Sequence, residues 1–382
     1  MSARIFSVGL AIFAMLFGAG NVVFPLNLGR EAGSQVFFAI LGLVMSGVAV
    51  PLLGLVSASL FDGDYKKFLN MTGRIPGAFL ALVCMLLIGP FGATPRCITL
   101  AYAAVRWHIP DLSLMIFSLV VAALVFAATI KRRFVVDLMG RILGPIKLTL
   151  LLSIIVLGFF AVATPQPSDL SAIDAFYKGL KEGYWTLDLL GTIFFSGLII
   201  SSIKANSKKT LSSHQVAMFG LKAGVIGGLL LGAIYTGFCL LAAKFGLQVA
   251  GVPKDQLLSA LATLVLGPRA SLLANATMAI ACLTTAIALT AVFADYLRHE
   301  LFFGKIQYPY ALLLTVTATF AMTNLGFAGI ASIIEPVVVV CYPALIVLSL
   351  GNAAYALWGF KYVQPIVILT FIGTLISNFW PF

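Results

Sequence analysis

Charged residues are scarce in this sequence. Asp, Glu, Lys and Arg make up 10% of its 382 residues, whereas an ordinary soluble domain carries roughly 25%. Hydrophobic residues make up 61%, and the mean hydropathy is +1.08. The polar stretches between the apolar runs are too short to form a soluble domain. This composition excludes a soluble globular fold and predicts an all-α polytopic membrane protein.

Motifs of enzymes, metal sites and disulfide frameworks are also missing. The five cysteines form no CxxC pair, and their odd number within apolar runs argues against structural disulfides and metal sites. The sequence has no Walker A motif, which excludes ATP as the energy source, and no HExxH or GxSxG motif. We therefore predict a protein that is not an enzyme and holds no cofactor.

The sequence does carry an excess of positive charge, with a formal net charge of +11. In a soluble protein such a charge can indicate nucleic-acid binding, but here Lys and Arg cluster in short loops. Counted from a cytoplasmic N-terminus, fourteen loop Lys and Arg fall inside and seven fall outside. The positive-inside rule therefore predicts a cytoplasmic N-terminus. The basic loops are expected to contact anionic membrane lipid, with no nucleic-acid partner.

Long apolar runs dominate the chain. A bilayer span takes about 20 helical residues, and eleven runs reach that length, at about 4–28, 34–60, 76–104, 111–130, 139–163, 186–204, 215–244, 270–297, 308–324, 326–349 and 363–380. Glu335, Pro336 and Pro343 interrupt the tenth run, which predicts either one interrupted helix or two short ones. We therefore expect 11 or 12 transmembrane helices.

The first run, IFSVGLAIFAMLFGAGNVVFP, has helix-breaking residues in its middle, at Gly18, Ala19, Gly20 and Asn21, with Pro25 just beyond. Backbone groups freed at such a break are costly in hydrocarbon, so a broken helix must line a cavity, bind a ligand or be buried. The alternative is a kinked helix that uses glycine for close packing. In secondary transporters, half-helix ends form the binding site. Amides that start the second half suit a carboxylate, and carbonyls that end the first half suit Na⁺.

A polar stretch divides the chain into two halves of five spans. We predict a first repeat at 1–163, a connecting loop at 164–185, a second repeat at 186–355 and an extra C-terminal helix at 356–382. An odd number of spans per repeat inverts the second copy, so the first span of each half corresponds. The run at 186–204 contains Phe194, Phe195, Ser196 and Gly197, where we predict the second break.

Two adjacent threonines, Thr284 and Thr285, lie within the eighth run. Their hydroxyl oxygens could complete a cation site beside the broken first helix. The alternative is that each hydroxyl bonds back to a carbonyl of its own helix.

Several ionisable residues lie within or at the ends of spans, where charge is costly and usually functional. Arg96 and Glu335 are flanked by apolar sequence. Glu335 either titrates in proton coupling or pairs structurally with Arg96 or Lys147. Asp188 opens the sixth run, where we interpret it as an acid that favours the helix N-terminus.

Four motifs in order, FAMLFGAGNVVFPLNLGREAG, IGPFGATPR, GYWTLDLLGTIFFSGLI and ACLTTAIALT, resemble the branched-chain amino acid:cation symporters. The resemblance implies the leucine-transporter fold, a 5+5 inverted repeat with broken first and sixth helices. It also implies import of leucine, isoleucine and valine with Na⁺, or in some members H⁺, across the bacterial inner membrane.

The resemblance assigns roles to particular residues. Those expected to bind substrate are Gly18, Ala19, Gly20, Asn21, Phe194, Phe195 and Ser196. Those expected to hold Na⁺ are Ala14 and Phe17, through carbonyls, and Thr284 and Thr285, through hydroxyls. Glu335 and Arg96 remain candidates for proton coupling or gating. Departures at Cys97 and Glu335, and a shorter chain, leave two alternatives open. One is an H⁺-coupled carrier of another apolar or neutral amino acid, and the other is a non-transporting sensor or channel.

Overall fold

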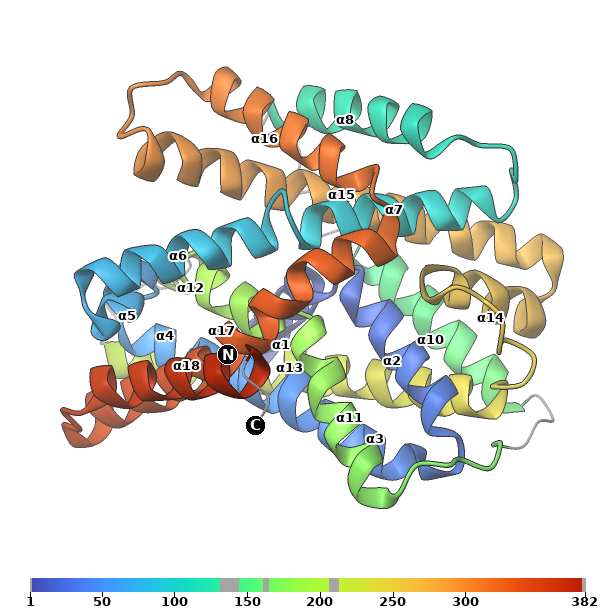
Figure 1. Cartoon of the computed structure of the whole chain (residues 1–382), viewed down its shortest axis with the longest axis horizontal. Coiled ribbons are helices and arrows are strands. Elements are labelled where there is room, and N and C mark those ends of the chain that lie inside the picture. The colour runs from blue at the N-terminus through green and yellow to red at the C-terminus, as the bar shows by residue number, and fades with distance from the viewer. Residues whose placement is uncertain (1, 131–143, 161–164, 206–212, 380–382) are drawn as a thin grey trace.

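The computed structural model describes residues 2–130, 144–160, 165–205 and 213–379, and every regular element in these ranges is helical (Figure 1). In chain order the α-helices are α1 (Ser2–Leu16), α2 (Gly20–Ala32), α3 (Val36–Val44), α4 (Val50–Leu60), α5 (Tyr65–Leu69), α6 (Arg74–Ile88), α7 (Ala93–Arg106), α8 (Leu114–Ile130), α10 (Gly144–Phe160), α11 (Ala172–Trp185), α12 (Asp188–Ala205), α13 (Ser213–Lys244), α14 (Leu257–Leu266), α15 (Pro268–Tyr296), α16 (Tyr308–Thr323), α17 (Gly326–Trp358) and α18 (Val363–Phe379).

Five stretches of helix are long and apolar enough to cross a membrane, by length and composition. They are Gly20–Leu60, Arg74–Arg106, Met218–Lys244, Pro268–Leu301 and Gly326–Trp358. Shorter apolar helices account for other predicted spans. The tenth run is one continuous helix, α17, with Pro336 and Pro343 inside it. Over the described ranges, each of the eleven predicted spans therefore corresponds to a helix or a pair of helices.

The first and sixth spans are both broken, as predicted, but the second break lies elsewhere than expected. The first span is interrupted between Leu16 and Gly20. The sixth is interrupted at Thr186 and Leu187, between α11 and α12. The predicted break at 194–197 is wrong, because α12 runs continuously through it. A methyl group on Gly197 would lie 3.0 Å from the carbonyl oxygen of Gly63, so this glycine serves close packing.

The position of the break also corrects the expected loop at 164–185. Residues 172–185 form α11, which is the first half of the broken sixth span. Ser171 caps its start by accepting a hydrogen bond from the amide of Asp174 at 3.1 Å, the standard N-cap arrangement. The third span is interrupted as well, at residues 89–92 between α6 and α7, which the sequence analysis did not predict.

Two groups of helices enclose the centre of the molecule (Figure 1). One group contains α7, α8, α15 and α16, which pack on one another. The other contains α1 to α4 and α11 to α13, and α17 and α18 pack together beside it. The two broken spans belong to the second group, and their breaks face α7 and α15 of the first.

Glycines allow close contact within the second group. A methyl group on Gly179 of α11 would lie 2.0 Å from the carbonyl oxygen of Ala39 in α3. A methyl group on Gly42 of α3 would lie 2.1 Å from the carbonyl oxygen of Phe176 in α11. Small residues let the backbones of membrane helices approach closely. This close packing matters because the hydrophobic effect contributes little to helix association within lipid. This pair of glycines therefore fixes the first half of the sixth span against the second span.

We expect Gly179→Ala to destabilise the protein by roughly 1–3 kcal/mol, the usual cost of overpacking. The new methyl group would clash with a backbone carbonyl oxygen, which cannot rotate away as a side chain can. The measurement is thermal unfolding in detergent. Gly373→Ala in α18 is the matched control, since nothing lies within 4 Å of its methyl position. Equal melting temperatures for the two variants would contradict the close contact.

Candidate substrate site at the helix breaks

The two helix breaks touch each other at Gly20. A methyl group on Gly20 would lie 3.1 Å from both the α carbon of Thr186 and the carbonyl oxygen of Trp185. Leu187 has a positive φ of 62°, which is uncommon for a residue other than glycine and marks a turn held by its surroundings. The start of α2 therefore lies directly against the turn that joins α11 to α12.

Asn21 joins the two breaks by hydrogen bonds and is 1% exposed. Its Oδ1 accepts from the amide of Gly18 at 2.7 Å. Its Nδ2 donates to the carboxylate of Asp188, 2.9 Å from Oδ1 and 2.8 Å from Oδ2, and also to the hydroxyl of Tyr235. Tyr235 in turn donates to Oδ2 of Asp188 at 2.6 Å. One polar cluster thus connects the first break, the sixth break and α13.

Arg96 lies on α7, just after the interruption of the third span, and is 1% exposed. Its Nη1 donates to the carbonyl oxygen of Trp185 at 2.9 Å. Its guanidinium carbon lies 5.4 Å from the ring centroid of Phe24 in α2, within reach of a cation–π contact. Arg96 therefore connects α7 to both broken spans.

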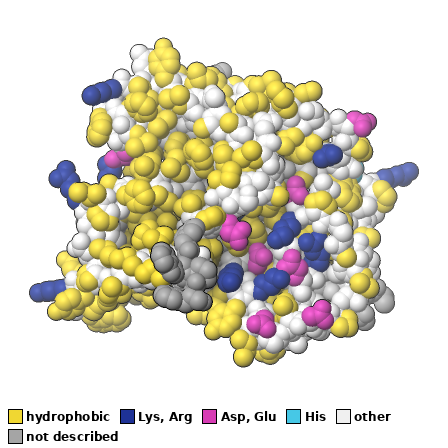
Figure 2. Space-filling view, in the orientation of Figure 1, with side chains coloured by type: hydrophobic (Ala, Val, Ile, Leu, Met, Phe, Trp, Pro, Cys, Tyr) yellow, Lys and Arg dark blue, Asp and Glu magenta, His cyan; other side chains and the backbone are white. Residues whose placement is uncertain are grey.

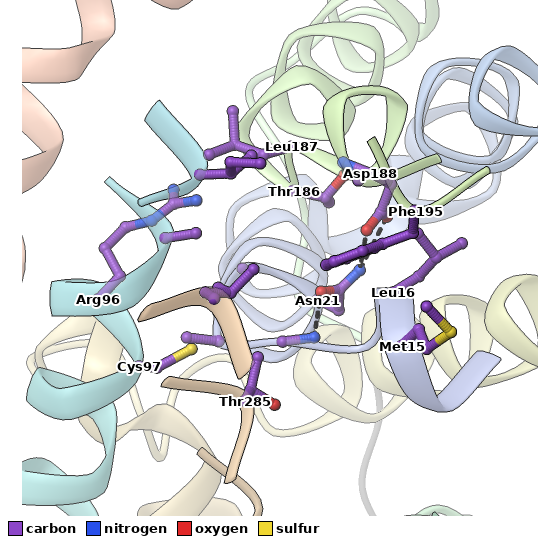
Figure 3. Close-up of a pocket in the computed structure, with 17 residues that line it drawn as sticks. Met15, Leu16, Asn21, Arg96, Cys97, Thr186, Leu187, Asp188, Phe195 and Thr285 are labelled. Atoms are coloured by element: carbon purple, nitrogen blue, oxygen red, sulfur yellow. Dashed lines mark hydrogen bonds between the residues drawn. The ribbon is translucent and has the colours of Figure 1, made fainter. Parts of the chain in front are cut away.

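A small cavity lies among these groups (Figure 3). It encloses about 40 Å³, enough for one or two water molecules. Its polar or backbone-rich wall includes Gly18, Ala19, Gly20, Asn21, Arg96, Thr186, Asp188 and Thr285. Its apolar wall includes Met15, Leu16, Ile88, Leu187, Phe195 and Leu289. The lining of the cavity therefore combines two buried charged side chains with apolar ones.

Most of the predicted substrate-binding residues line this cavity. Those that do are Gly18, Ala19, Gly20, Asn21 and Phe195. Two expected residues lie elsewhere, and this corrects the expectation for them. Phe194 packs on Tyr65, with ring centroids 4.9 Å apart. Ser196 donates to the carbonyl oxygens of Ile193 at 2.6 Å and Gly63 at 3.4 Å. Phe194 therefore contacts α5 and Ser196 contacts the turn before it, because α12 is a regular helix there.

The predicted cation ligands are only partly brought together. Thr285 lines the cavity, and its methyl carbon lies 3.8 Å from the methyl position of Gly18. Both threonine hydroxyls donate to the carbonyl oxygen of Ala281, at 2.8 Å for Thr284 and 3.0 Å for Thr285. A hydroxyl that donates in this way keeps its lone pairs for a cation. The Na⁺ site that includes Ala14 and Phe17 therefore stays a prediction.

Glu335 does not pair with Arg96, so that structural hypothesis is wrong. Glu335 is exposed on α17, whereas Arg96 is buried against Trp185. The side chain of Lys147, the other suggested partner, lies outside the described residues. A role for Glu335 in proton coupling stays a prediction.

Sequence reasoning missed the two residues that anchor the polar cluster. Asp188 was interpreted only as a helix-terminal acid, and Tyr235 was not singled out. The sequence did offer one signal for Asp188: it is a carboxylate at the edge of an apolar span, in the same motif as the sixth-span break. The contacts themselves join residues up to 214 positions apart, and no local pattern encodes them.

Charged side chains also connect α2 with α11 and with the segment before α14. Lys178 Nζ lies 2.6 Å from Glu31 Oε2. Arg30 donates to the carbonyl oxygen of Val252 at 2.6 Å, in the segment before α14. Figure 2 shows charged side chains of both signs gathered over α2 and α11, while hydrophobic side chains cover much of the remaining face. The charged patch marks where these half-helices leave the apolar zone.

A helical membrane protein whose two broken spans meet at a central polar cavity is a secondary transporter of the leucine-transporter fold. Solved structures agree on the fold. The nucleobase-cation-symport-1 family transporter Mhp1 in a closed conformation matches with a TM-score of 0.62 and 14% identity, over 98% of this chain and 92% of that one. MhsT in complex with L-phenylalanine matches with a TM-score of 0.59 and 15% identity, over 98% of each chain.

Sequence comparison identifies the family. The family model described as "Branched-chain amino acid transport protein" matches residues 1–379. Branched-chain amino acid permease BraB of Bacillus subtilis is 32% identical over 382 residues, 96% of this chain and 83% of the permease. Branched-chain amino acid permease BrnQ of Escherichia coli K12 is 30% identical over 388 residues, 98% of this chain and 86% of the permease. The chain belongs to the branched-chain amino acid transport protein family and is a transport protein, not an enzyme.

Proposed function

We propose that this protein imports leucine, isoleucine and valine together with Na⁺. The observation that carries the proposal is the cavity at the helix breaks, whose lining combines buried polar groups with the apolar side chains of Leu16, Ile88, Phe195 and Leu289. An α-amino acid needs polar partners at one end, and a branched aliphatic side chain needs an apolar wall at the other. The permeases BraB and BrnQ, by their names, act on the same class of substrate.

Transport requires the cavity to open. Its volume of about 40 Å³ is too small for leucine, so substrate enters only when the helices around the breaks move apart. We propose alternating access, in which Na⁺ and substrate bind the outward-open and occluded states more tightly than the inward-open state. We propose that the ion pair between Glu31, near the end of α2, and Lys178, within α11, stabilises the closed state.

We propose that the coupling ion binds beside the first break. We propose that Na⁺ binds carbonyl oxygens of Ala14 and Phe17 and the hydroxyls of Thr284 and Thr285. Oxygen ligands without a carboxylate suit a monovalent cation, and the proximity of Thr285 to Gly18 supports this position. The protein is expected in the bacterial inner membrane with a cytoplasmic N-terminus, as its basic loops indicate.

Radiolabelled leucine uptake into proteoliposomes tests the proposal. We expect uptake that depends on an inward Na⁺ gradient and is competed by valine and isoleucine. Uptake driven only by a pH gradient would support the proposed substrate but show that the coupling ion is H⁺ and not Na⁺. Folded protein that takes up none of the three amino acids under either gradient would contradict the proposed substrate.

The double variant Thr284→Ala plus Thr285→Ala should lose Na⁺ stimulation of uptake while still folding, because it removes both hydroxyl ligands and no charge. The measurement is the initial rate of leucine uptake at a series of Na⁺ concentrations. The Na⁺ concentration that gives half-maximal uptake should rise at least about tenfold. Thr277→Ala is the control, since this exposed hydroxyl on the same helix also bonds back, to Leu273 at 2.9 Å. Unchanged Na⁺ dependence in the double variant would exclude the site.

A further inference from the structure

Arg96 is a buried cation that forms no direct ion pair with the described residues. A guanidinium has five N–H donors, but in this structure Nη1 donates to one carbonyl oxygen and the buried Nε has no hydrogen-bond partner. Among the described residues, no carboxylate lies within ion-pair distance of it. Burying an unpaired charge is strongly unfavourable. Arg96 lines the cavity, so an anion that enters the cavity can supply the missing partner.

Asp188 is the complementary case, a buried carboxylate that forms no direct ion pair with the described residues. It is 2% exposed, and its side-chain partners are the neutral groups of Asn21 and Tyr235. Those hydrogen bonds hold the carboxylate in place but do not neutralise it. Asp188 also lines the cavity, which therefore contains one buried charge of each sign.

The two charges approach the cavity from different elements. Figure 3 shows Arg96 on α7 at one side, and Asp188 with Asn21 at the other. Arg96 donates to Trp185 and not to Asp188, so the two do not form a direct ion pair. A ligand that carries an ammonium group and a carboxylate on the same carbon atom, together with an aliphatic group, matches this arrangement in charge and in polarity.

On the basis of the proposed function, we propose that Arg96 binds the α-carboxylate of the substrate and that Asp188 binds its α-ammonium group. Asn21 and Tyr235 orient the Asp188 carboxylate for this role. The amides at the start of α2 assist Arg96, since the guanidinium lies over Phe24, one helical turn beyond Gly20. A guanidinium forms two parallel hydrogen bonds with a carboxylate, which fixes the zwitterion and leaves the aliphatic side chain to the apolar residues of the lining. This assigns both ends of the substrate to side chains.

Ligands that lack one charged end test the assignment. Leucine without its carboxylate is 3-methylbutylamine, and leucine without its amino group is 4-methylpentanoate. The affinity of each is measured by competition with radiolabelled leucine on purified protein. In Arg96→Gln we expect leucine affinity to fall at least about tenfold, with the amine within twofold of its wild-type affinity. In Asp188→Asn we expect the same loss for leucine, with 4-methylpentanoate within twofold.

The controls separate recognition from folding. Arg106→Gln is matched to Arg96→Gln, since Arg106 lies on the same helix and its guanidinium is 5.7 Å from the ring of Tyr102, but outside the cavity. Glu182→Gln is matched to Asp188→Asn as a buried acid that does not line the cavity. Both controls should retain leucine affinity. If Arg96→Gln does not fold, Arg96→Lys takes its place, with leucine affinity reduced by loss of the two-bond geometry and the amine unaffected.

Two results would overturn the assignment. One is unchanged leucine affinity in the Arg96 or Asp188 variant. The other is an equal loss for leucine and for the truncated ligand, which indicates a purely structural role. Failure of the proposed function is different, since wild-type protein would then bind none of the three branched-chain amino acids.

Discussion

Replacing Asn21 with leucine should abolish transport and destabilise the folded protein by roughly 3 kcal/mol or more, the usual cost of breaking a buried charged interaction. The leucine side chain is similar in size, so the loss is of hydrogen bonds and not of volume. It removes the acceptor of the Gly18 amide and two donors to the Asp188 carboxylate. The carboxylate then keeps Tyr235 as its remaining side-chain donor, and the two helix breaks lose their hydrogen-bonded connection.

Thermal unfolding and leucine uptake measure the two effects separately. Asn352→Leu is the matched control, because Asn352 is also fully buried and donates to the carbonyl oxygen of Phe68 at 2.8 Å, away from the cavity. It should lower the melting temperature but leave the affinity for leucine unchanged. Normal uptake by the Asn21→Leu variant would show that the polar cluster is not needed for transport.

The first break was predictable because its cause is local. Gly18 and Gly20 weaken a helix wherever they occur, and Asn21 has a side chain that bonds readily to nearby backbone. In the structure its Oδ1 does so, accepting from the Gly18 amide three residues earlier. A sequence of this kind in the middle of an apolar span determines the interruption without help from the rest of the chain.

The second break was misplaced because its cause is tertiary. Thr186 accepts a hydrogen bond from the amide of Asp188 at 3.4 Å, which is only a weak local turn signal, and Leu187 adopts a positive φ without being glycine. The turn is held by Arg96, which donates to the Trp185 carbonyl from α7, and by the start of α2 at Gly20. Gly197 drew the prediction to 194–197, but it serves packing against Gly63. A contact made across 89 residues leaves no trace in the local sequence.

The charged residues illustrate the same division. Composition correctly marked Arg96 as costly in an apolar setting, but its partner could not be deduced, and the suggested pairing with Glu335 was wrong. Asp188 was underestimated because a helix N-terminus offered a sufficient local explanation. Its burial under Asn21 and Tyr235 arises only when α2, α12 and α13 pack together.

Gly20→Leu should block both substrate binding and transport. We expect it to disturb the cavity more than Asn21→Leu does. Even a methyl group at this position would lie 3.1 Å from the α carbon of Thr186 and the carbonyl oxygen of Trp185, which is tighter than an ordinary van der Waals contact. The rest of the leucine side chain can only extend into the cavity or force the two breaks apart. Either outcome removes the space that the substrate needs and displaces the carbonyl that holds Arg96.

Direct leucine binding to purified protein measures this effect, with a thermal melt to establish that the variant is folded. Gly373→Leu is the matched control, because this glycine also lies in a membrane helix and has nothing within 4 Å of its methyl position. We expect the control to bind like wild type and the Gly20 variant to show no saturable binding. High-affinity binding by folded Gly20→Leu would mean that the substrate lies away from the contact between the two breaks, and the cavity described here would lose its assignment.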